Sequence, residues 1–255
     1  MNATLQLINA RTSTRTFSAQ EITGAERETI LHAALRAPTA GAMMLYSIIQ
    51  IEVQALKDRL AVTCDDQPFI ARAPWVLIFA ADMQRWMDLF SASDVGSLPG
   101  VPHLEAPGLG DLMMACSDAL IAAQTAVIAA ESIGIGSCYI GDILEQAETH
   151  AELLGLPNHT LPVAMLCFGH PRAVRPPTPH CTSHVVHTDR YHRLTADELE
   201  GLSAELAAMY APHGLKPGFA NYPQSIYERK FACEFMAEMN RSVEWWLRRW
   251  VTPQR

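Results

Sequence analysis

Charged residues are scarce in this chain of 255 residues: Asp, Glu, Lys and Arg together make up 18%. Basic residues are the scarcer sign, with 19 against 27 acidic ones, and the net charge is −8. A net acidic chain without a basic run is a poor nucleic-acid binder, because that affinity comes from Lys and Arg that neutralise phosphates. The low charged fraction predicts much buried surface, including a subunit interface, and any bound anion must be met by a local cluster of Arg.

The chain also lacks a C-x-x-C pair and a disulfide framework, since its six cysteines are scattered and most lie in apolar runs. The first residues contain no apolar signal core. The most apolar long stretch, residues 109–133, carries acidic side chains such as Asp118 and Glu131, which a lipid-facing span would not tolerate. We therefore expect free buried thiols and a soluble cytoplasmic protein with no membrane partner.

Several catalytic motifs are missing as well: there is no G-x-S-x-G, no H-E-x-x-H and no P-loop, so nothing indicates nucleophilic or metal-dependent hydrolysis. Cys181, His184 and His187 have a spacing that a helix could use to bind zinc. Val185, Val186 and the nearby prolines favour extended chain, in which these side chains diverge. We predict no metal site and name no catalytic side chain.

Apolar periodicity and turn residues predict a series of helices and strands without a repeat or a Gly/Ser linker. Thr23 and Glu26 have the spacing of a capping box at the start of the first helix. The turn-rich stretch 91–107 is expected to form a loop or a lid. The expected helices are 22–35, 55–63, 109–133, 143–154, 196–210 and 225–250, and the expected strands are 46–53, 74–81, 137–141 and 162–169.

Three segments have features of a ligand site. Arg11 and Arg15, four residues apart with hydroxyls between them, suit a phosphate, although solvated arginines would look the same. The small residues of Ala37–Gly41 allow close approach of a flat ligand, or simply end a helix. The glycines of Gly134-Ile-Gly136 end the long helix in a turn that can present N–H groups to a ring, or are an ordinary cap. The last helix, rich in aromatic residues, requires a surface to cover, either in its own core or on a second subunit.

Taken in order, these segments resemble the nitroreductase family of FMN-dependent oxidoreductases, in particular its larger, NADPH-preferring nitroreductase and flavin reductase branch. The resemblance runs from about residue 5 to residue 191. Its most specific part is 118–141, followed by Leu153-Leu-Gly-Leu-Pro157 and Cys167-Phe-Gly-His-Pro171. The family implies an α+β fold with a mixed central sheet flanked by helices in an intertwined homodimer. We expect one domain over 1–255, with a core 1–195 and a helical extension 196–255 that wraps the partner.

The resemblance also implies the residues that hold FMN. Arg11, Ser13 and Arg15 would hold its phosphate and ribityl chain, and Gln67 would reach the ribityl chain or the pyrimidine edge. Thr39 would lie beside the isoalloxazine. The other face of the ring would meet a further set: Tyr139, Ile140 and Gly141.

This chain departs from the family pattern at several positions. Thr12 stands where many members have a second Arg, and Ala42 and Met44 stand where many have Asn and Gln. Where members commonly have Lys or Arg to complete the phosphate site, this chain has His180. We expect His180, or Arg172 or Arg175, to substitute there, and the tail residues Arg229 and Arg241 are candidates for the 2′-phosphate of NADPH.

The function implied is a two-step relay in which NADPH or NADH gives a hydride to FMN and a small electron-poor acceptor, such as a nitroaromatic, a quinone or a flavin, takes it up. Two alternatives remain open. The same fold could run a different flavin reaction on a dedicated metabolite, or the chain could be a flavin-free ligand-binding protein.

Overall fold

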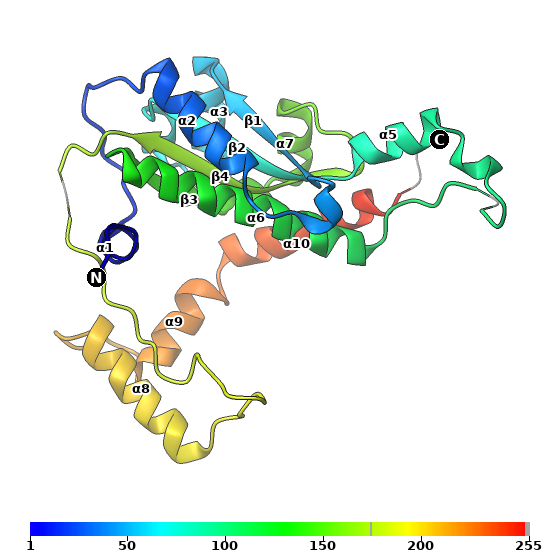
Figure 1. Ribbon diagram of the computed structural model, residues 1–255. Helices are drawn as coiled ribbons and strands as arrows, with labels where there is room; N and C mark the ends of the chain where they lie inside the picture. Colours follow the sequence, from blue (N-terminus) through cyan, green and yellow to red (C-terminus); the bar gives the residue numbers. More distant parts are fainter. Residues whose placement is uncertain (102, 174, 253–255) are drawn as a thin grey trace. The chain divides into compact units, whose positions relative to one another are not determined.

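The computed structural model describes residues 1–101, 103–173 and 175–252, and the chain forms two compact units (Figure 1). The first unit contains Met1–Pro176 and the C-terminal stretch from Met239, and the second contains Pro177–Glu238. The division between the units falls in the proline-rich stretch, and the end of the chain belongs to the first unit.

A four-stranded sheet in the order β1-β2-β4-β3 forms the centre of the first unit. Its strands are β1 (Tyr46–Ile51), β2 (Trp75–Asp82), β3 (Gly136–Ile140) and β4 (Thr160–Gly169). The predicted mixed sheet is corrected here, because every strand pair in the described part of the chain is antiparallel. Among the described residues, parallel pairing is limited to an isolated bridge between Ser13 and Ser137. Apolar patterns predict a strand but not its direction, which depends on how the intervening helices return the chain.

Helices cover both faces of this sheet (Figure 1). One face packs on α2 (Gly24–Leu35) and the long α6 (Leu109–Ser132), and the other on α3 (Gln54–Thr63), α4 (Pro68–Ala71) and the 3-10 turn η3 (Asp142–Leu144). The face of α6 toward the sheet is mostly alanine, which lets the helix lie close to β2 and β4. By length and composition, α6 is the one described helix that could cross a membrane, but in this fold it is a core helix.

A third apolar cluster is built in part by η1 (Ala40–Ala42), α5 (Gln84–Ala92) and α7 (Ala147–Leu153). Outside it, α1 (Ala3–Ala10) packs on α6, and the turn η2 (Val95–Ser97) follows α5. The last helix, α10 (Glu234–Trp250), buries Trp246 and Trp250 in this cluster. The Trp250 indole N–H donates to the Gly108 carbonyl at 3.0 Å, and the Trp246 indole donates to the Leu144 carbonyl at 3.1 Å. These two aromatic residues of the tail therefore lie in the chain's own core.

The second unit consists of α8 (Ala196–Tyr210), α9 (Tyr222–Lys230) and the start of α10. The Tyr210 hydroxyl accepts from the Cys181 backbone N–H at 3.1 Å and donates to the Pro179 carbonyl at 3.2 Å. The rings of Tyr210 and Tyr222 stack with 5.8 Å between their centroids. One tyrosine thus ties the start of this unit to both of its helices.

Most predicted elements are confirmed. The Thr23–Glu26 capping box is formed at the start of α2, and α8 has the predicted bounds. The single helix expected over 225–250 is instead two, because the chain leaves the helix at Phe231 before α10 begins. The helix expected over 143–154 is reduced to η3 and α7, and α1 and α5 were not predicted.

Candidate functional site

The arginine segment at the N-terminus lies against the sheet edge. Arg11 ends α1, and its N–H donates to the Leu7 carbonyl at 3.0 Å. Two residues later, Ser13 forms the bridge with Ser137 of β3, and the Thr14 N–H donates to the Ser137 carbonyl at 2.8 Å. The segment therefore runs beside β3 and is held by backbone hydrogen bonds, so its side chains remain available to a ligand.

Arg11, Ser13 and Arg15 all lie in the neighbourhood of Cys138 of β3, whose thiol is buried. Burial raises the pKa of this thiol, while the positive charges of Arg15 and Arg11 and a hydrogen bond with Ser13 act in the opposite direction. Such a group of guanidinium and hydroxyl donors suits a phosphate, since an anion gains charge-assisted hydrogen bonds from each donor.

Two glycines make room for this segment. A Cβ at Gly136 would lie 2.3 Å from Oγ1 of Thr14, and one at Gly169 would lie 2.4 Å from Cδ1 of Phe17. Neither position tolerates a side chain without moving the segment, because real Cβ contacts are never this short. Gly136 is therefore required by packing, whereas Gly134, with a φ of 79°, is the glycine that the turn itself requires.

The three predicted site residues at the end of β3, Tyr139, Ile140 and Gly141, differ in how much of each is accessible to a ligand. The Tyr139 side chain is partly exposed, its hydroxyl donates to Oε1 of Gln124 at 3.3 Å, and burial raises its pKa to about 12. The Ile140 side chain is buried in the core, so this residue can offer only its backbone to a ligand. Gly141 follows at the turn into η3.

Gln67 lies in a turn that the first unit places near Arg15. Its amide donates to the Cys64 carbonyl at 2.9 Å, and the two residues before it, Asp65 and Asp66, have positive φ angles of 59° and 47°. Two positions further on, the ring of Phe69 lies 5.9 Å from the Arg15 guanidinium carbon. The structure thus brings the Gln67 turn to the same side as the arginine segment.

Thr39 lies in the loop between α2 and β1, where its side chain is used within the protein. Its hydroxyl donates to Oδ2 of Asp118 and accepts from the Met44 N–H at 2.8 Å. Asp118 and Gln124, the partner of Tyr139, both lie on α6, six residues and therefore about 9 Å apart along the helix axis. The Thr39 loop and Tyr139 are thus attached to the same helix.

His180 belongs to the second unit, so its predicted role depends on the sequence alone. Two histidines that follow it have partners of their own: the His187 ring packs against that of Tyr191 at a tilt of 48°, and His192 pairs with Glu198 at 3.0 Å. Among the residues that the structure describes, no three His, Cys, Asp or Glu side chains gather as metal ligands.

Arg172 is one of the residues expected to replace the Lys or Arg that completes the phosphate site in members of the family that the sequence resembles. It lines the same hollow as Arg15. The hollow is also lined by Arg72 and by the backbone turn that begins at Thr16, and the Arg172 N–H donates to the Thr16 carbonyl at 3.1 Å. Three guanidinium-bearing residues therefore border one concave surface beside the arginine segment.

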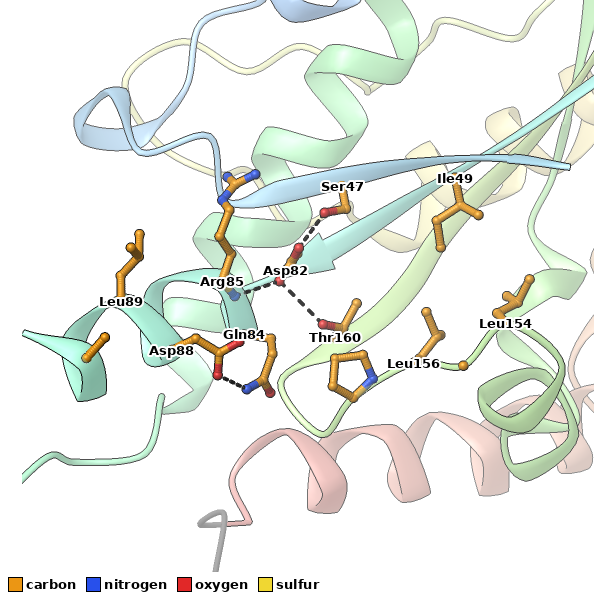
Figure 2. A pocket seen from close by; sticks show the side chains of 13 residues that line it. Ser47, Ile49, Asp82, Gln84, Arg85, Asp88, Leu89, Leu154, Leu156 and Thr160 are labelled. Atoms are coloured by element: carbon orange, nitrogen blue, oxygen red, sulfur yellow. Dashed lines mark hydrogen bonds between the residues drawn. The ribbon is translucent and has the colours of Figure 1, made fainter.

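A second hollow, of about 640 Å³, lies at the C-terminal end of β2, where Asp82 is the last residue of the strand (Figure 2). Asp82 lies within it and accepts hydrogen bonds from the hydroxyls of Ser47 and Thr160 and from the Arg85 N–H. None of the site residues predicted from the sequence lines this hollow. The carboxylate is satisfied by its neighbours, which is consistent with a structural role.

Two polar residues of α6 that sequence reasoning did not single out lie beside predicted site residues. Asp118 is 3% exposed and binds the Thr39 loop, and Glu131 lies near Arg11. Burial raises the pKa of Glu131, and the charge of Arg11 acts against it. The available signal was a carboxylate in an otherwise apolar helix, which we took as evidence against a membrane span and as part of the family resemblance.

The fold and the site together define an α+β protein with an arginine-lined hollow beside its central sheet. The model of the nitroreductase family matches residues 8–170. An oxygen-insensitive NADPH nitroreductase of Salmonella typhimurium is 31% identical over 84% of this chain and 85% of its own length, and an NADPH-flavin oxidoreductase of Vibrio harveyi is 29% identical over 89% and 90%. The structure of the NADPH:FMN oxidoreductase of Vibrio harveyi in complex with NAD⁺ superposes with a TM-score of 0.78 at 27% identity, covering 96% of this chain and 98% of that one.

The chain belongs to the nitroreductase family. It is an NAD(P)H-dependent oxidoreductase, related to flavin and nitro reductases that act on small-molecule acceptors. Its fold is the nitroreductase fold, a central sheet flanked by helices.

Proposed function

We propose that this protein binds FMN at the edge of β3 and uses it to reduce an electron-poor acceptor at the expense of NAD(P)H. The observation that carries the proposal is the arginine segment at the sheet edge, where Ser13 forms a bridge with Ser137 and Arg15 shares a hollow with Arg72 and Arg172. Relatives named as FMN reductases support the choice of cofactor.

The donor set fits a flavin mononucleotide. Arg11, Ser13 and Arg15 would hold the phosphate and ribityl chain, with Arg172 as a further cation in the adjoining hollow. Gly136 supports this fit, since it leaves the space in which Thr14 lies and so sets the position of the segment. His180 stays a candidate for the same phosphate.

The ring end of the cofactor would meet residues of three different elements. Tyr139 would present its partly exposed side chain, Ile140 and Gly141 their backbone, and Gln67 its amide. Thr39 would contribute through the backbone of its loop, because its hydroxyl already donates a hydrogen bond to Asp118. Bound FMN supplies reversible hydride chemistry, which lets donor and acceptor react in turn.

NADPH is the proposed hydride donor. The two arginines considered for its 2′-phosphate, Arg229 and Arg241, have different surroundings. Arg241 forms a bidentate ion pair with Glu148, at 2.7 and 2.8 Å. Arg229 instead lines a hollow of the second unit together with Lys216 and His213. We assign the 2′-phosphate to Arg229, because a guanidinium already paired with a carboxylate gains little from a second anion.

The assembly we propose is a cytoplasmic homodimer. The second unit exposes large apolar side chains, including Tyr227 and Phe231, each 65% exposed. A partner subunit would cover such groups, as the family resemblance implies. The proposal is checked by the mass of the protein in solution, and a monomer at micromolar concentration would contradict it.

The catalytic proposal is tested by titrating the purified protein with NADPH without oxygen. We expect the flavin absorbance to bleach and to return when a quinone or nitroaromatic is added. Return with many such acceptors supports the two-step relay. Bleaching that only a single dedicated metabolite reverses would instead favour a different flavin reaction on the same fold, and a protein without flavin would favour a ligand-binding role.

A further inference from the structure

The loop from Thr39 to Leu45 has a backbone that its residues do not favour. Gly41, Ala42 and Met44 all lie in the left-handed region, with φ angles of 56°, 57° and 52°. Ala and Met rarely adopt this conformation, because Cβ crowds the following carbonyl. The loop must therefore be held in this shape by contacts with its surroundings.

Asp118 supplies these contacts from inside the fold. Its Oδ1 accepts from the Ala40 N–H at 2.9 Å, and its Oδ2 accepts from the Leu45 N–H at 3.2 Å and from the Thr39 hydroxyl. Because the Thr39 hydroxyl also accepts from the Met44 N–H, one carboxylate ties together the two ends of the loop. Both of its oxygens act as acceptors, so a charged carboxylate matches the donors that surround it.

The carbonyl groups of the same loop are held from the other side by α5. The Trp86 indole N–H donates to the Met43 carbonyl at 2.9 Å, and the Arg85 guanidinium donates to the Met44 carbonyl. Arg85 rises beside Asp82 toward this part of the chain (Figure 2). The loop is thus fixed through both its N–H and its C=O groups.

A carboxylate in the apolar face of α6 is costly to bury and does nothing for the helix itself. Asp118 is 3% exposed, between alanines that pack on the sheet. Its partners are the three donors of the loop, so the loop is the feature that accounts for a carboxylate at this position.

We propose that Asp118 is a positioning residue, which holds the Thr39–Leu45 loop in its left-handed conformation and thereby fixes the contact of this loop with the flavin. The inference deepens the proposed function and depends on it. Asp118 itself does not touch the cofactor, because its oxygens are occupied by the loop.

The decisive variant is Asp118→Asn, which keeps the shape but turns one acceptor into a donor that faces the N–H groups of the loop. The matched control is Val127→Ala, which leaves a cavity in the same buried helix nine residues from Asp118, about 13 Å along the helix axis. Two readouts are needed: hydrogen exchange of the Ala40 and Leu45 amides, which requires no flavin, and the affinity and visible spectrum of bound FMN.

We expect Asp118→Asn to speed exchange at both amides, to weaken FMN binding by about tenfold or more and to shift the flavin spectrum. Val127→Ala should lower thermal stability and leave the spectrum and the two amides unchanged. If Asp118→Asn binds FMN like the wild type with an unchanged spectrum, the inference is wrong. If the wild type itself takes up no FMN, the proposed function fails, while the exchange data still decide whether Asp118 holds the loop.

Should Asp118→Asn not fold, Thr39→Val decides the question, because it removes one hydrogen bond to Asp118 and leaves the two from the backbone. We expect faster exchange at the Met44 amide and a smaller spectral shift of the same sign. An unchanged spectrum together with unchanged exchange would overturn the inference.

Discussion

Nε2 of His150 lies 2.8 Å from Oγ1 of Thr63, in an interior where the histidine has no exposed surface. The other ring nitrogen, Nδ1, lies 2.9 Å from the Ile143 carbonyl. A carbonyl can only accept, so Nδ1 carries a proton, while the single proton of the Thr63 hydroxyl has two acceptors within reach, Nε2 and the Arg59 carbonyl at 3.0 Å. This histidine connects the end of α3, just before the Gln67 turn, to α7 and η3.

Burial lowers the pKa of His150, and nearby backbone carbonyls only partly offset this. The unfolded chain therefore binds a proton at a higher pH than the folded protein does. Above about pH 6.5 the group is neutral in both states, and below it the free energy of unfolding falls, by at most about 1.4 kcal/mol for each unit by which the pKa is lowered.

We expect thermal stability of the wild type to fall between about pH 7 and pH 5 more steeply than that of His150→Gln, which cannot titrate. The control is His103→Gln, at an exposed histidine. Equal pH slopes for the wild type and His150→Gln would show that His150 does not contribute.

Gly136→Ala tests whether the arginine segment depends on its packing against β3. The new Cβ would meet Thr14 at 2.3 Å, so the segment must move away from the strand. We expect FMN affinity to fall by about tenfold or more, the equivalent of about 1.4 kcal/mol. Gly110→Ala is the matched control, since it lies in α6 with no neighbour within 4 Å and should stabilise the helix by about 0.5–1 kcal/mol. Equal FMN binding by both variants would exclude the segment from the site.

Trp250→Ala should destabilise the protein by about 3–5 kcal/mol, because the ring is fully buried and its N–H is bonded to the Gly108 carbonyl. Trp250→Phe keeps most of the packing and should lose about 1–2 kcal/mol. Chemical unfolding followed by circular dichroism measures both. A loss of less than about 1 kcal/mol for Trp250→Ala would mean that α10 is not part of the core.

Arg229→Gln and Arg241→Gln separate the two arginines considered for NADPH. We expect Arg229→Gln to raise the KM for NADPH by about tenfold and to leave that for NADH unchanged, because only NADPH carries the 2′-phosphate. Arg241→Gln removes a surface ion pair and should cost at most about 1 kcal/mol of stability, without an effect on either KM. The opposite pattern would move the 2′-phosphate site to Arg241.

The sequence predicted the elements whose signals are local. The Thr23–Glu26 capping box marked the start of α2, and the apolar run of β2 marked a central strand. The strand directions were missed, because they depend on contacts between residues far apart. The break at Phe231 was missed because it has neither glycine nor proline to signal it.

The candidate site could be predicted only in part for the same reason. The resemblance singled out Arg11, Ser13 and Arg15, and the structure shows that the segment carrying them runs beside β3. The sequence could not indicate that the Thr39 hydroxyl donates to Asp118, which is 79 positions away in the chain. Nor could it indicate that the Ile140 side chain is buried in the core.

The most direct test of the account is the absorption spectrum of the purified protein before and after denaturation, with the released chromophore identified. We predict the bands of an oxidised flavin and about one FMN released per chain. A colourless protein that also fails to take up added FMN would contradict the central claim, and would mean that Thr12, Ala42, Met44 and His180 have removed the flavin site from this member of the family.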